Sequence, residues 1–445
     1  MSNDIRIKKG LDIKLKGEAE KTISNAIVSK YYALRPEDFH SVIPKLSVKV
    51  GSKVKAGEPV FYNKNQENVK FASPVSGEVI EIARGEKRRI LEIKIQADTT
   101  QTFQDNGKLD VGTAKAEEIK KHLLASGCWP FVKQRPYDVI ANPDKSPKAI
   151  FVSAYASAPL VADLDFVLQG KEAELQAAVT ALGKLTDGKV HVSVGKNSNS
   201  PLSGLTGIEL HKVSGPHPSG NVGTQINKID PINKGEIVWT VNAQDLVIIG
   251  ELLLTGKFNA ERIVAMVGSS ISNPRYFVTK IGSEVSTMIY TKGIEKNANV
   301  RIISGNVLSG KQINPDGYLD YYSNTITVIP EGDDYEFFQA ANLGANNGLR
   351  GYRNERFSGK SAFVQSTDLR FNLNRIKTSL IPFDIGFYGG FDYGRVWVDS
   401  EKSDTWNNSF GGGVFANALD IFVINLSAFS SDDGLRLAFK LGLGF

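Results

Sequence analysis

The chain has 445 residues, of which 41% are hydrophobic and 23% charged, so its composition is that of an ordinary globular protein with room for two to four domains. Its formal net charge is only +5, and this weak bias gives no reason to expect a nucleic-acid partner. The densest basic run is Lys87-Arg88-Arg89, which follows Glu86 and fits a solvated hairpin tip better than a binding patch.

Cysteine and histidine are too sparse for most metal centres. The single cysteine, Cys128, excludes disulfides within the chain and multi-cysteine zinc or iron–sulfur sites. The five histidines form no close-spaced helical pair, so we expect no metal site. The first residues lack the apolar core of a signal peptide, and no stretch reaches about 18 apolar residues. The sequence therefore predicts a cytoplasmic chain without a membrane-spanning helix.

Residues 46–96 alternate short β-type runs with Gly and Pro, which predicts a small sandwich or barrel. The patterns Val-Gly-x-x-Val-x-x-Gly at 50–57 and Ser-Pro-x-x-Gly-x-Val at 73–79 resemble the lipoyl/biotinyl fold, the barrel-sandwich hybrid. Carrier domains of that family attach their cofactor to a lysine at a hairpin tip, but the corresponding position here holds Gln66, and Lys64 and Lys70 are out of register. We therefore expect a packing module with no covalently bound cofactor.

The middle of the chain predicts strand–helix–strand order. Residues 114–125 and parts of 158–185 have helical spacing and good helix formers, whereas 148–154 and 189–194 are typical of buried strands. This order predicts an α/β domain with a partly parallel sheet. Residues 236–329 return to β patterning and predict a mixed α+β region, with strands at 237–241, 246–254, 262–267, 275–281 and 300–304.

After Phe338 the pattern changes to long alternating strands. In the last of them, alternate residues from Leu435 to Phe445 are apolar. Such alternation is typical of outer-membrane barrels, whose strands alternate between lipid and lumen. We count roughly six strands, whereas a closed membrane barrel needs about eight or more. The tail is therefore expected to form an antiparallel sheet that resembles an incomplete barrel.

Four stretches, in a fixed order, carry a family resemblance over residues 1–338. They include Ser126-Gly127-Cys128-Trp129-Pro130-Phe131, His217-Pro218-Ser219-Gly220 and a closing Tyr335-Glu336-Phe337-Phe338. With Ile7-Lys8-Lys9-Gly10-Leu11-Asp12 at the start, this set resembles the A subunit of the Na+-translocating NADH:quinone reductase.

The resemblance implies an α+β multidomain architecture. Its parts would be an N-terminal segment with the barrel-sandwich hybrid at about 46–96, a Rossmann-like α/β domain, a β-grasp (ubiquitin-like) domain and the barrel-like tail. The expected boundaries are 1–105, 106–235, 236–338 and 339–445.

The family also resembles the NADH-binding flavoprotein subunit of respiratory complex I and the C subunit of the Rnf complex. Those relatives carry a Gly-rich loop whose backbone N–H groups cradle the flavin phosphate. The corresponding loop here, 125–130, keeps only Gly127 and places Cys128 and Trp129 beside it. We interpret this as loss of the flavin site, with FMN and NADH bound by other subunits. A plain helix-terminating turn fits the same residues.

The same loop offers groups that suit a quinone. Trp129, Phe131 and Tyr137 provide aromatic faces, and Arg135 can donate to a carbonyl oxygen. A ubiquinone or menaquinone headgroup is a planar ring with two acceptor oxygens, so these four residues are a candidate site. A helix-packing cluster is the alternative.

Two further segments are candidates for contacts. The Gly/Pro loop 214–220, with His217 and Gly220, can present backbone donors to a ligand or partner, although a plain connection also fits. No catalytic triad or P-loop is legible, so we assign no catalytic residue.

The tail resembles the end of the barrel superfamily used in outer-membrane protein assembly and two-partner secretion. Leu349-Arg350-Gly351-Tyr352 is similar to that family's loop motif, and Phe391-Asp392-Tyr393-Gly394 to its strand motif, although Gly390 replaces the usual aromatic residue. The resemblance implies that Arg350 meets Asp392. Because members of the reductase family continue differently after Phe338, the chain is expected to be a chimera.

The sequence thus favours a peripheral subunit of a sodium-pumping NADH:quinone oxidoreductase, on the cytoplasmic face of the bacterial inner membrane. It would contribute to quinone binding and complex assembly, with the other subunits and quinone as partners, and would lack activity in isolation. Two alternatives stay open: a non-catalytic adaptor or docking module, and, from the tail alone, an outer-membrane barrel protein.

Overall fold

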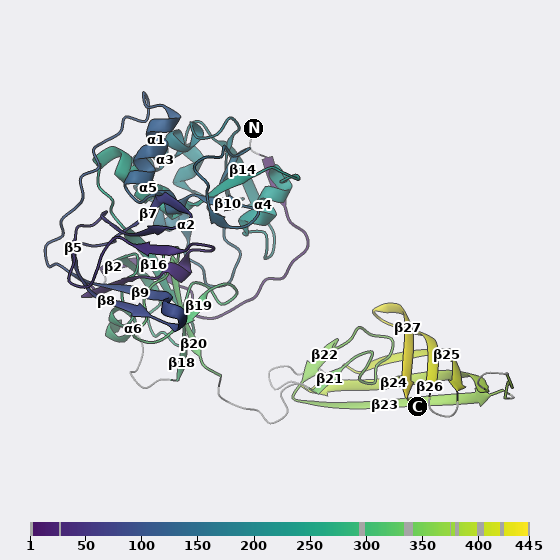
Figure 1. The fold of residues 1–445 in the computed structure, drawn as a ribbon. Coiled ribbons are helices and arrows are strands. Elements are labelled where there is room, and N and C mark those ends of the chain that lie inside the picture. Colours follow the sequence, from purple (N-terminus) through teal and green to yellow (C-terminus); the bar gives the residue numbers. More distant parts are fainter. Residues whose placement is uncertain are drawn as a thin grey trace. The chain divides into compact units, whose positions relative to one another are not determined.

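The computed structural model describes residues 3–25, 28–292, 299–332, 341–373, 375–378, 382–397, 405–418 and 422–443 (Figure 1). The chain divides into two compact units, Met1–Glu331 and Gly332–Phe445. Within the described ranges, no helix combines the length and the apolar character that crossing a bilayer requires.

Two small antiparallel sheets pack together near the N-terminus and form a sandwich. Aromatic side chains fill the space between them: Phe61 stacks on Phe71 with ring centroids 4.3 Å apart, and Phe39 lies 4.4 Å from Phe71. The strand orders are β3-β9-β8-β5 and β4-β6-β7. The strands are β3 (Tyr31–Leu34), β4 (Pro44–Leu46), β5 (Lys53–Val54), β6 (Pro59–Asn63), β7 (Gln66–Ala72), β8 (Gly77–Arg84) and β9 (Ile90–Ala97), with a 3-10 turn η1 (Pro36–Asp38) after β3.

The basic run Lys87-Arg88-Arg89 lies where the sequence predicted, at the exposed tip of a hairpin. A short 3-10 turn, η2 (Glu86–Arg88), joins β8 to β9 there. Lys87 and Arg88 both have positive φ, at 53° and 62°, although neither is glycine.

A seven-stranded sheet forms the α/β part, in the order β1-β14-β13-β12-β15-β10-β11. The first five of these strands are parallel to one another, and β10 and β11 are antiparallel additions at one edge. The strands are β1 (Asn3–Arg6), β10 (Lys133–Arg135), β11 (Val139–Ile140), β12 (Ile150–Ser153), β13 (Val190–Gly195), β14 (Glu209–Ser214) and β15 (Val238–Asn242).

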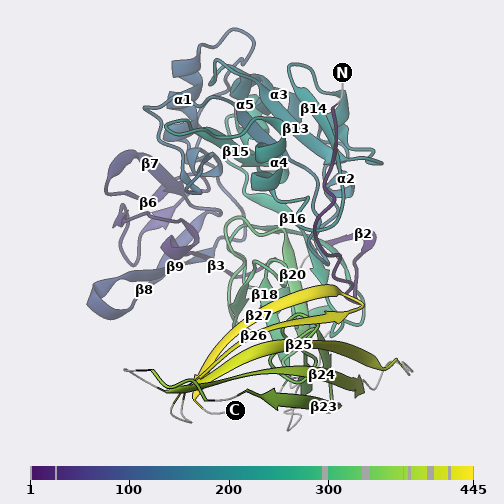
Figure 2. The same ribbon diagram turned by 90° about the vertical axis from the view of Figure 1, so that its right-hand side faces the viewer.

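Helices cover both faces of this sheet because successive residues of a strand point to opposite sides. Ile150 and Val152 of β12 join the core with α3 and α5, whereas Phe151 packs with Ile226 of α4 on the other face. Figure 2 shows these helices around strands β13, β14 and β15 of the sheet. The helices are α1 (Ala116–Ala125), α2 (Leu164–Val167), α3 (Glu172–Gly183), α4 (Val222–Ile229) and α5 (Ala243–Thr255), with 3-10 turns η3 (Trp129–Phe131) and η4 (Pro201–Gly204).

The strand predicted at 246–254 is wrong, because this segment belongs to α5. The helix packs beside α3 and against β15 of the sheet, and nine of its residues are buried. Its less buried side also carries apolar residues, Val247 and Leu254, so its 3.6-residue period is hidden in the sequence. Because β15 and α5 pack with the seven-stranded sheet, the α/β part continues past residue 235 to the end of this helix.

The last sheet of the first unit has six strands in the order β19-β18-β20-β16-β17-β2, and α6 packs on it. The strands predicted at 262–267, 275–281 and 300–304 are confirmed. The N-terminal segment links this sheet to the previous one, since β1 pairs with β14 and β2 with β17. The elements are β2 (Glu20–Asn25), β16 (Glu261–Val267), β17 (Arg275–Lys280), α6 (Ser286–Lys292), β18 (Val300–Ser304), β19 (Lys311–Ile313) and β20 (Thr325–Pro330).

The second unit is built on a five-stranded antiparallel sheet in the order β23-β24-β25-β26-β27, with a small two-stranded sheet β21-β22. One face of the large sheet is apolar and exposed: Leu435 and Leu437 of β27 are each 72% exposed, and Phe439 and Leu441 are each 68% exposed. The strands are β21 (Ala341–Leu343), β22 (Phe357–Gly359), β23 (Ser361–Asn372), β24 (Phe383–Trp397), β25 (Asn407–Ala418), β26 (Phe422–Ser431) and β27 (Gly434–Leu443).

The contact between α3 and α5 allows a sharp test of the packing. A Cβ added to Gly250 would lie 1.9 Å from the carbonyl oxygen of Glu174, so Gly250→Ala forces the two helices apart. We expect this change to lower the free energy of unfolding of the first unit by about 2–3 kcal/mol. Gly223→Ala in α4 is the matched control, because an added Cβ there meets nothing within 4 Å. Urea denaturation measures both, and equal stability of the two variants would contradict the packing described here.

Candidate functional site

The loop that follows α1 turns sharply into the interior. Gly127 has φ +75°, and a Cβ added to it would lie 2.6 Å from the Cβ of Ala72 in β7. The loop therefore lies directly against the N-terminal sandwich, and the glycine that survives in it serves this close approach. Cys128, the next residue, is fully buried, and burial raises the pKa of its thiol.

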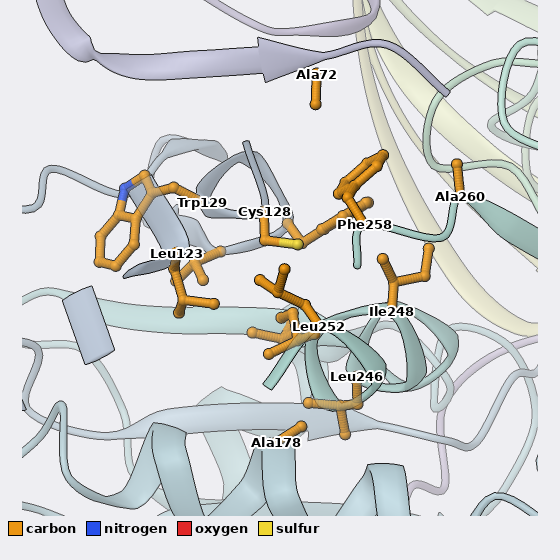
Figure 3. Packing of buried hydrophobic residues seen from close by; sticks show 14 of the residues in the cluster. Ala72, Leu123, Cys128, Trp129, Ala178, Leu246, Ile248, Leu252, Phe258 and Ala260 are labelled. Atoms are coloured by element: carbon orange, nitrogen blue, oxygen red, sulfur yellow. The ribbon is translucent and has the colours of Figure 1, made fainter. Parts of the chain in front are cut away.

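Trp129 and Phe131 point into the core rather than into a cavity. The Nε1–H of Trp129 donates to the carbonyl oxygen of Ala141 at 2.7 Å, and its ring meets Trp239 edge-on at 5.4 Å. Phe131 stacks on Tyr321, with centroids 5.1 Å apart. Figure 3 shows Trp129 and Cys128 among Leu123, Leu252 and Phe258, side chains that come from several elements. These aromatic residues hold the domains together.

Arg135 and Tyr137 lie outside this core. Tyr137 is 74% exposed, and Arg135 is half-buried and pairs with Asp138 at 3.4 Å. The structure therefore does not bring the four candidate quinone residues to one surface. A planar ring can reach Arg135 and Tyr137, whereas Trp129 and Phe131 are closed off by their own packing. The short turn η3 directs both rings inward, and no local pattern in the sequence indicates that direction.

The order of the parallel strands reverses between β12 and β15. The chain runs from β12 outward to β13 and β14 and then returns to β15 on the other side of β12. In doubly wound sheets a ligand phosphate sits at such a point, against the N-terminus of the helix that follows a strand. Here the helix after β15 is α5, and its first turn contains Asp245.

Asp245 is the chain's own anion at this helix N-terminus. Nη2 of Arg262 donates to its Oδ1 at 2.5 Å, and Nδ2 of Asn242 donates to its Oδ2 at 2.9 Å. The side chains of Asp245 and Arg262 are 0% and 1% exposed. Burial raises the pKa of Asp245, while Arg262 and Asn242 favour the charged form. A buried carboxylate in the first turn of α5 places negative charge where the helix dipole would otherwise attract a phosphate.

Three domain models of one family match this chain. They are described as the NqrA N-terminal barrel-sandwich hybrid domain at residues 5–98, the NqrA second alpha/beta domain at 114–258 and the NQRA C-terminal domain at 263–314. The A subunit of the Na(+)-translocating NADH-quinone reductase of Saccharophagus degradans is 35% identical over 370 residues, 82% of each chain. The same proteins of Neisseria meningitidis serogroup A and of Pasteurella multocida are 36% and 34% identical over 75% and 77% of each chain.

The chain belongs to the NqrA family, the A subunits of the Na(+)-translocating NADH-quinone reductase. The barrel-sandwich hybrid expected near the N-terminus is confirmed by its domain model. The second α/β model ends at residue 258, just after α5, which agrees with the placement of β15 and α5 in the seven-stranded sheet.

The 214–220 loop of this NqrA family member is held by internal hydrogen bonds. The backbone N–H of Gly220 donates to Oγ of Ser157 at 2.7 Å, and the same hydroxyl lies 3.1 Å from Nδ1 of His217. The carbonyl oxygen of His217 accepts from the backbone N–H of Leu11 at 2.9 Å. The loop thus ties the N-terminal segment to the segment that follows β12, and the backbone N–H of Gly220 is not free to bind a ligand.

Sequence reasoning missed a pair of histidines on adjacent strands. Nδ1 of His191 in β13 lies 3.0 Å from Nε2 of His211 in β14. Burial, with a smaller contribution from His211, lowers the pKa of His191 to about 4, so this imidazole is neutral at pH 7. Only the parallel pairing of the strands brings these residues together. Among the residues that the structure describes, no three His, Cys, Asp or Glu side chains are placed to hold a metal ion.

In the second unit the two residues expected to meet are in contact. Nη2 of Arg350 donates to Oδ1 of Asp392 at 2.7 Å, and the backbone N–H of Arg350 donates to Oδ2 at 2.8 Å. Asp392 is fully buried and also accepts from Oγ of Ser409. Arg350 lies over the ring of Phe429, 4.1 Å from its centroid. The pair anchors the loop that carries Arg350 on the sheet.

The Asp245–Arg262 pair makes a testable prediction. Asp245→Asn removes the negative charge and leaves a buried guanidinium without its partner, so we expect a loss of about 3–5 kcal/mol in the free energy of unfolding. The control is Glu117→Gln, because the Glu117–Lys120 pair lies on the surface with Glu117 82% exposed. The free energy of unfolding of Glu117→Gln is expected to equal that of the wild type within experimental scatter. Urea denaturation followed by circular dichroism measures both, and a stable Asp245→Asn variant would refute the structural role.

Proposed function

We propose that this chain is a peripheral subunit of a sodium-pumping NADH:quinone oxidoreductase and that it contributes to complex assembly and quinone binding. Membership of the NqrA family carries the proposal, since three domain models match in order over residues 5–314. Its place is the cytoplasmic face of the bacterial inner membrane, with the other subunits as partners. In isolation the chain lacks activity.

The interior of the α/β part supports a role without a flavin or NADH site in this chain. The strand order β14-β13-β12-β15 matches one half of a doubly wound sheet together with the first strand beyond its reversal point, so we propose a Rossmann-like domain there. At its reversal point the buried carboxylate of Asp245 lies in the first turn of the helix, where a bound phosphate would meet its negative charge. FMN and NADH therefore belong on other subunits. The six-stranded sheet with α6 is our proposed β-grasp domain.

In this proposal the quinone contacts Arg135 and Tyr137, the residues of segment 129–137 that lie at the surface. Arg135 can donate to a quinone carbonyl oxygen, and the exposed ring of Tyr137 offers a face for stacking. Trp129 and Phe131 support this loop from the core. The ubiquinone or menaquinone would then be held between this loop and a neighbouring subunit, because only two of the four candidate side chains are open to it.

The test uses the assembled complex purified through a tag on this chain. We expect the other subunits to co-purify, and we expect Tyr137→Ala and Arg135→Gln each to raise the KM for quinone about tenfold, which corresponds to roughly 1.4 kcal/mol of binding. NADH oxidation by a soluble artificial acceptor should not change, because it does not use the quinone site. Tyr62→Ala, on the N-terminal sandwich, is the control.

Two outcomes separate the alternatives. A complex that assembles normally while Tyr137→Ala and Arg135→Gln leave the KM for quinone unchanged would reduce this chain to a docking module. Assembly of the other subunits without this chain would overturn the proposal as a whole.

We propose that the second unit is an incomplete barrel of the outer-membrane type. We also propose that the chain is a chimera, in which this unit is joined to the part that matches the NqrA family. Its motif pair Arg350–Asp392 and its exposed apolar face support this proposal. When apolar and polar residues alternate along each strand, one face of the sheet is apolar and suits contact with lipid.

The apolar face predicts binding of hydrophobic dyes and detergent. Leu435→Ser, Leu437→Ser and Leu441→Ser together should sharply reduce ANS fluorescence and self-association of the full chain, since these side chains are 68–72% exposed. Ala438→Ser with Lys440→Ser, on the opposite face of the same strand, is the control and should change neither. Unchanged dye binding in the triple variant would mean that this face is covered by another part of the chain.

A further inference from the structure

A groove of about 650 Å³ opens between the tip of the β8–β9 hairpin and the segment that follows η1. Segment 36–44 forms one wall, and Arg84, Arg88 and Arg89 of the hairpin form the other. Its volume lies in the range of small-molecule sites, about 300–1,000 Å³. The two walls come from separate parts of the sequence, so the pattern of the basic run alone did not predict the groove.

The two walls differ in chemistry. Phe39 and Ile90 are 3% and 8% exposed and close the bottom of the groove. On the wall formed by segment 36–44, the side chain of Ile43 is 50% exposed and gives this wall an apolar surface, so we call it the apolar wall. The hairpin wall is cationic. Nη1 of Arg84 donates to the carbonyl oxygen of Arg88 at 3.1 Å, and this bond fixes the tip.

Positive charge in the groove exceeds negative charge. The three arginines face one carboxylate that lines the groove, Glu37, which lies 3.7 Å from Nη2 of Arg89 and is also paired with Lys311. Within the described residues, the guanidinium of Arg88 has no ion-pair partner. An anion is therefore the ligand that the charges of this groove favour, and a guanidinium fork matches phosphate oxygens.

The backbone on both walls has an unusual conformation. Ser41, Lys87 and Arg88 have φ between 53° and 62°, and they are three of the six described non-glycine residues with positive φ. Such residues cost of order 1 kcal/mol each and cluster at binding sites, where the surrounding structure holds them in place. Each wall thus contains at least one residue whose backbone conformation is unfavourable for its residue type. Loops that only connect two strands rarely need such residues.

We propose that this groove binds a phosphate ester that carries an apolar group. The phosphate lies between the guanidinium groups of Arg88 and Arg89, and the apolar group lies on Ile43. This site is independent of the quinone contact proposed above and lies on the N-terminal sandwich. Two sources have this chemistry, an anionic phospholipid headgroup and a soluble phosphate ester.

Isothermal titration calorimetry of the full chain with dihexanoyl phosphatidylglycerol, below its micelle concentration, tests the site. We expect saturable binding that weakens at least tenfold in the Arg88→Gln/Arg89→Gln double variant. The matched control is Lys53→Gln/Lys55→Gln, which removes two exposed positive charges elsewhere on the same sandwich. Equal affinity for the Arg88→Gln/Arg89→Gln variant and the wild type would overturn the proposal.

The apolar wall has its own test. Ile43→Ser should weaken binding of the dihexanoyl ester and leave binding of inorganic phosphate unchanged, since it removes only apolar contact. Inorganic phosphate that binds the wild type as tightly as the ester does would overturn the assignment of the apolar wall. All substituted side chains are exposed, so circular dichroism and the thermal transition should not change.

Vesicles separate the two sources of the ligand. Sedimentation with phosphatidylglycerol vesicles, compared between the wild type and Arg88→Gln/Arg89→Gln, isolates the groove, because the apolar face of the second unit is the same in both. An arginine-dependent bound fraction supports a lipid headgroup. Arginine-dependent binding of the soluble ester alone supports a soluble phosphate ester. Vesicle and ester binding that are both independent of the arginines would refute both sources.

Discussion

The first unit depends on one aromatic junction around Tyr321, where the N-terminal sandwich and the α/β part share a single core. The ring of Tyr321 lies 4.7 Å from Phe39 of the N-terminal sandwich and 5.1 Å from Phe131 of the α/β part. Phe131 in turn lies 6.3 Å from Phe258, which follows α5. The two sheets of the N-terminal sandwich have only four and three strands, and sheets of this size bury little apolar surface by themselves. Large rings placed between the sheets supply that surface, so the domains are expected to unfold together rather than one at a time.

This junction explains why the loop after α1 carries bulky residues beside its single glycine. A loop that cradles a phosphate must keep its backbone N–H groups open, whereas this loop fills its surroundings with Trp129 and Phe131. The buried Asp245 has the corresponding effect at the strand-order reversal, since its carboxylate occupies the helix N-terminus from inside. The loop after α1 and the N-terminus of α5 are both places where this type of fold can bind a cofactor. Here buried side chains of the chain itself fill both places.

Sequence patterns predicted those features that depend on neighbours along the chain. Helix α1 and strands β12, β13, β16 and β18 were predicted because their local spacing is clear. Helix α5 was predicted as a strand, because apolar residues also occupy its less buried side and leave no polar face to show its period. The inward direction of Trp129 and the pairing of His191 with His211 depend on tertiary placement, which no local pattern encodes. The contact of Arg350 with Asp392 came from motif resemblance and not from spacing.

Because the interior of the first unit is closed, its contacts with other molecules must be made at the surface. Two surface features are unusual for loops: an exposed aromatic ring and non-glycine residues with positive φ. Tyr137 leaves a large ring in solvent beside a charged pair, and the β8–β9 tip places Lys87 and Arg88 on a backbone with positive φ. Each feature costs free energy in the isolated chain, through exposed apolar area in the first case and backbone strain in the second. A partner that covers the ring, or an anion that engages the arginines, would recover that cost, so these two places are where binding gains most.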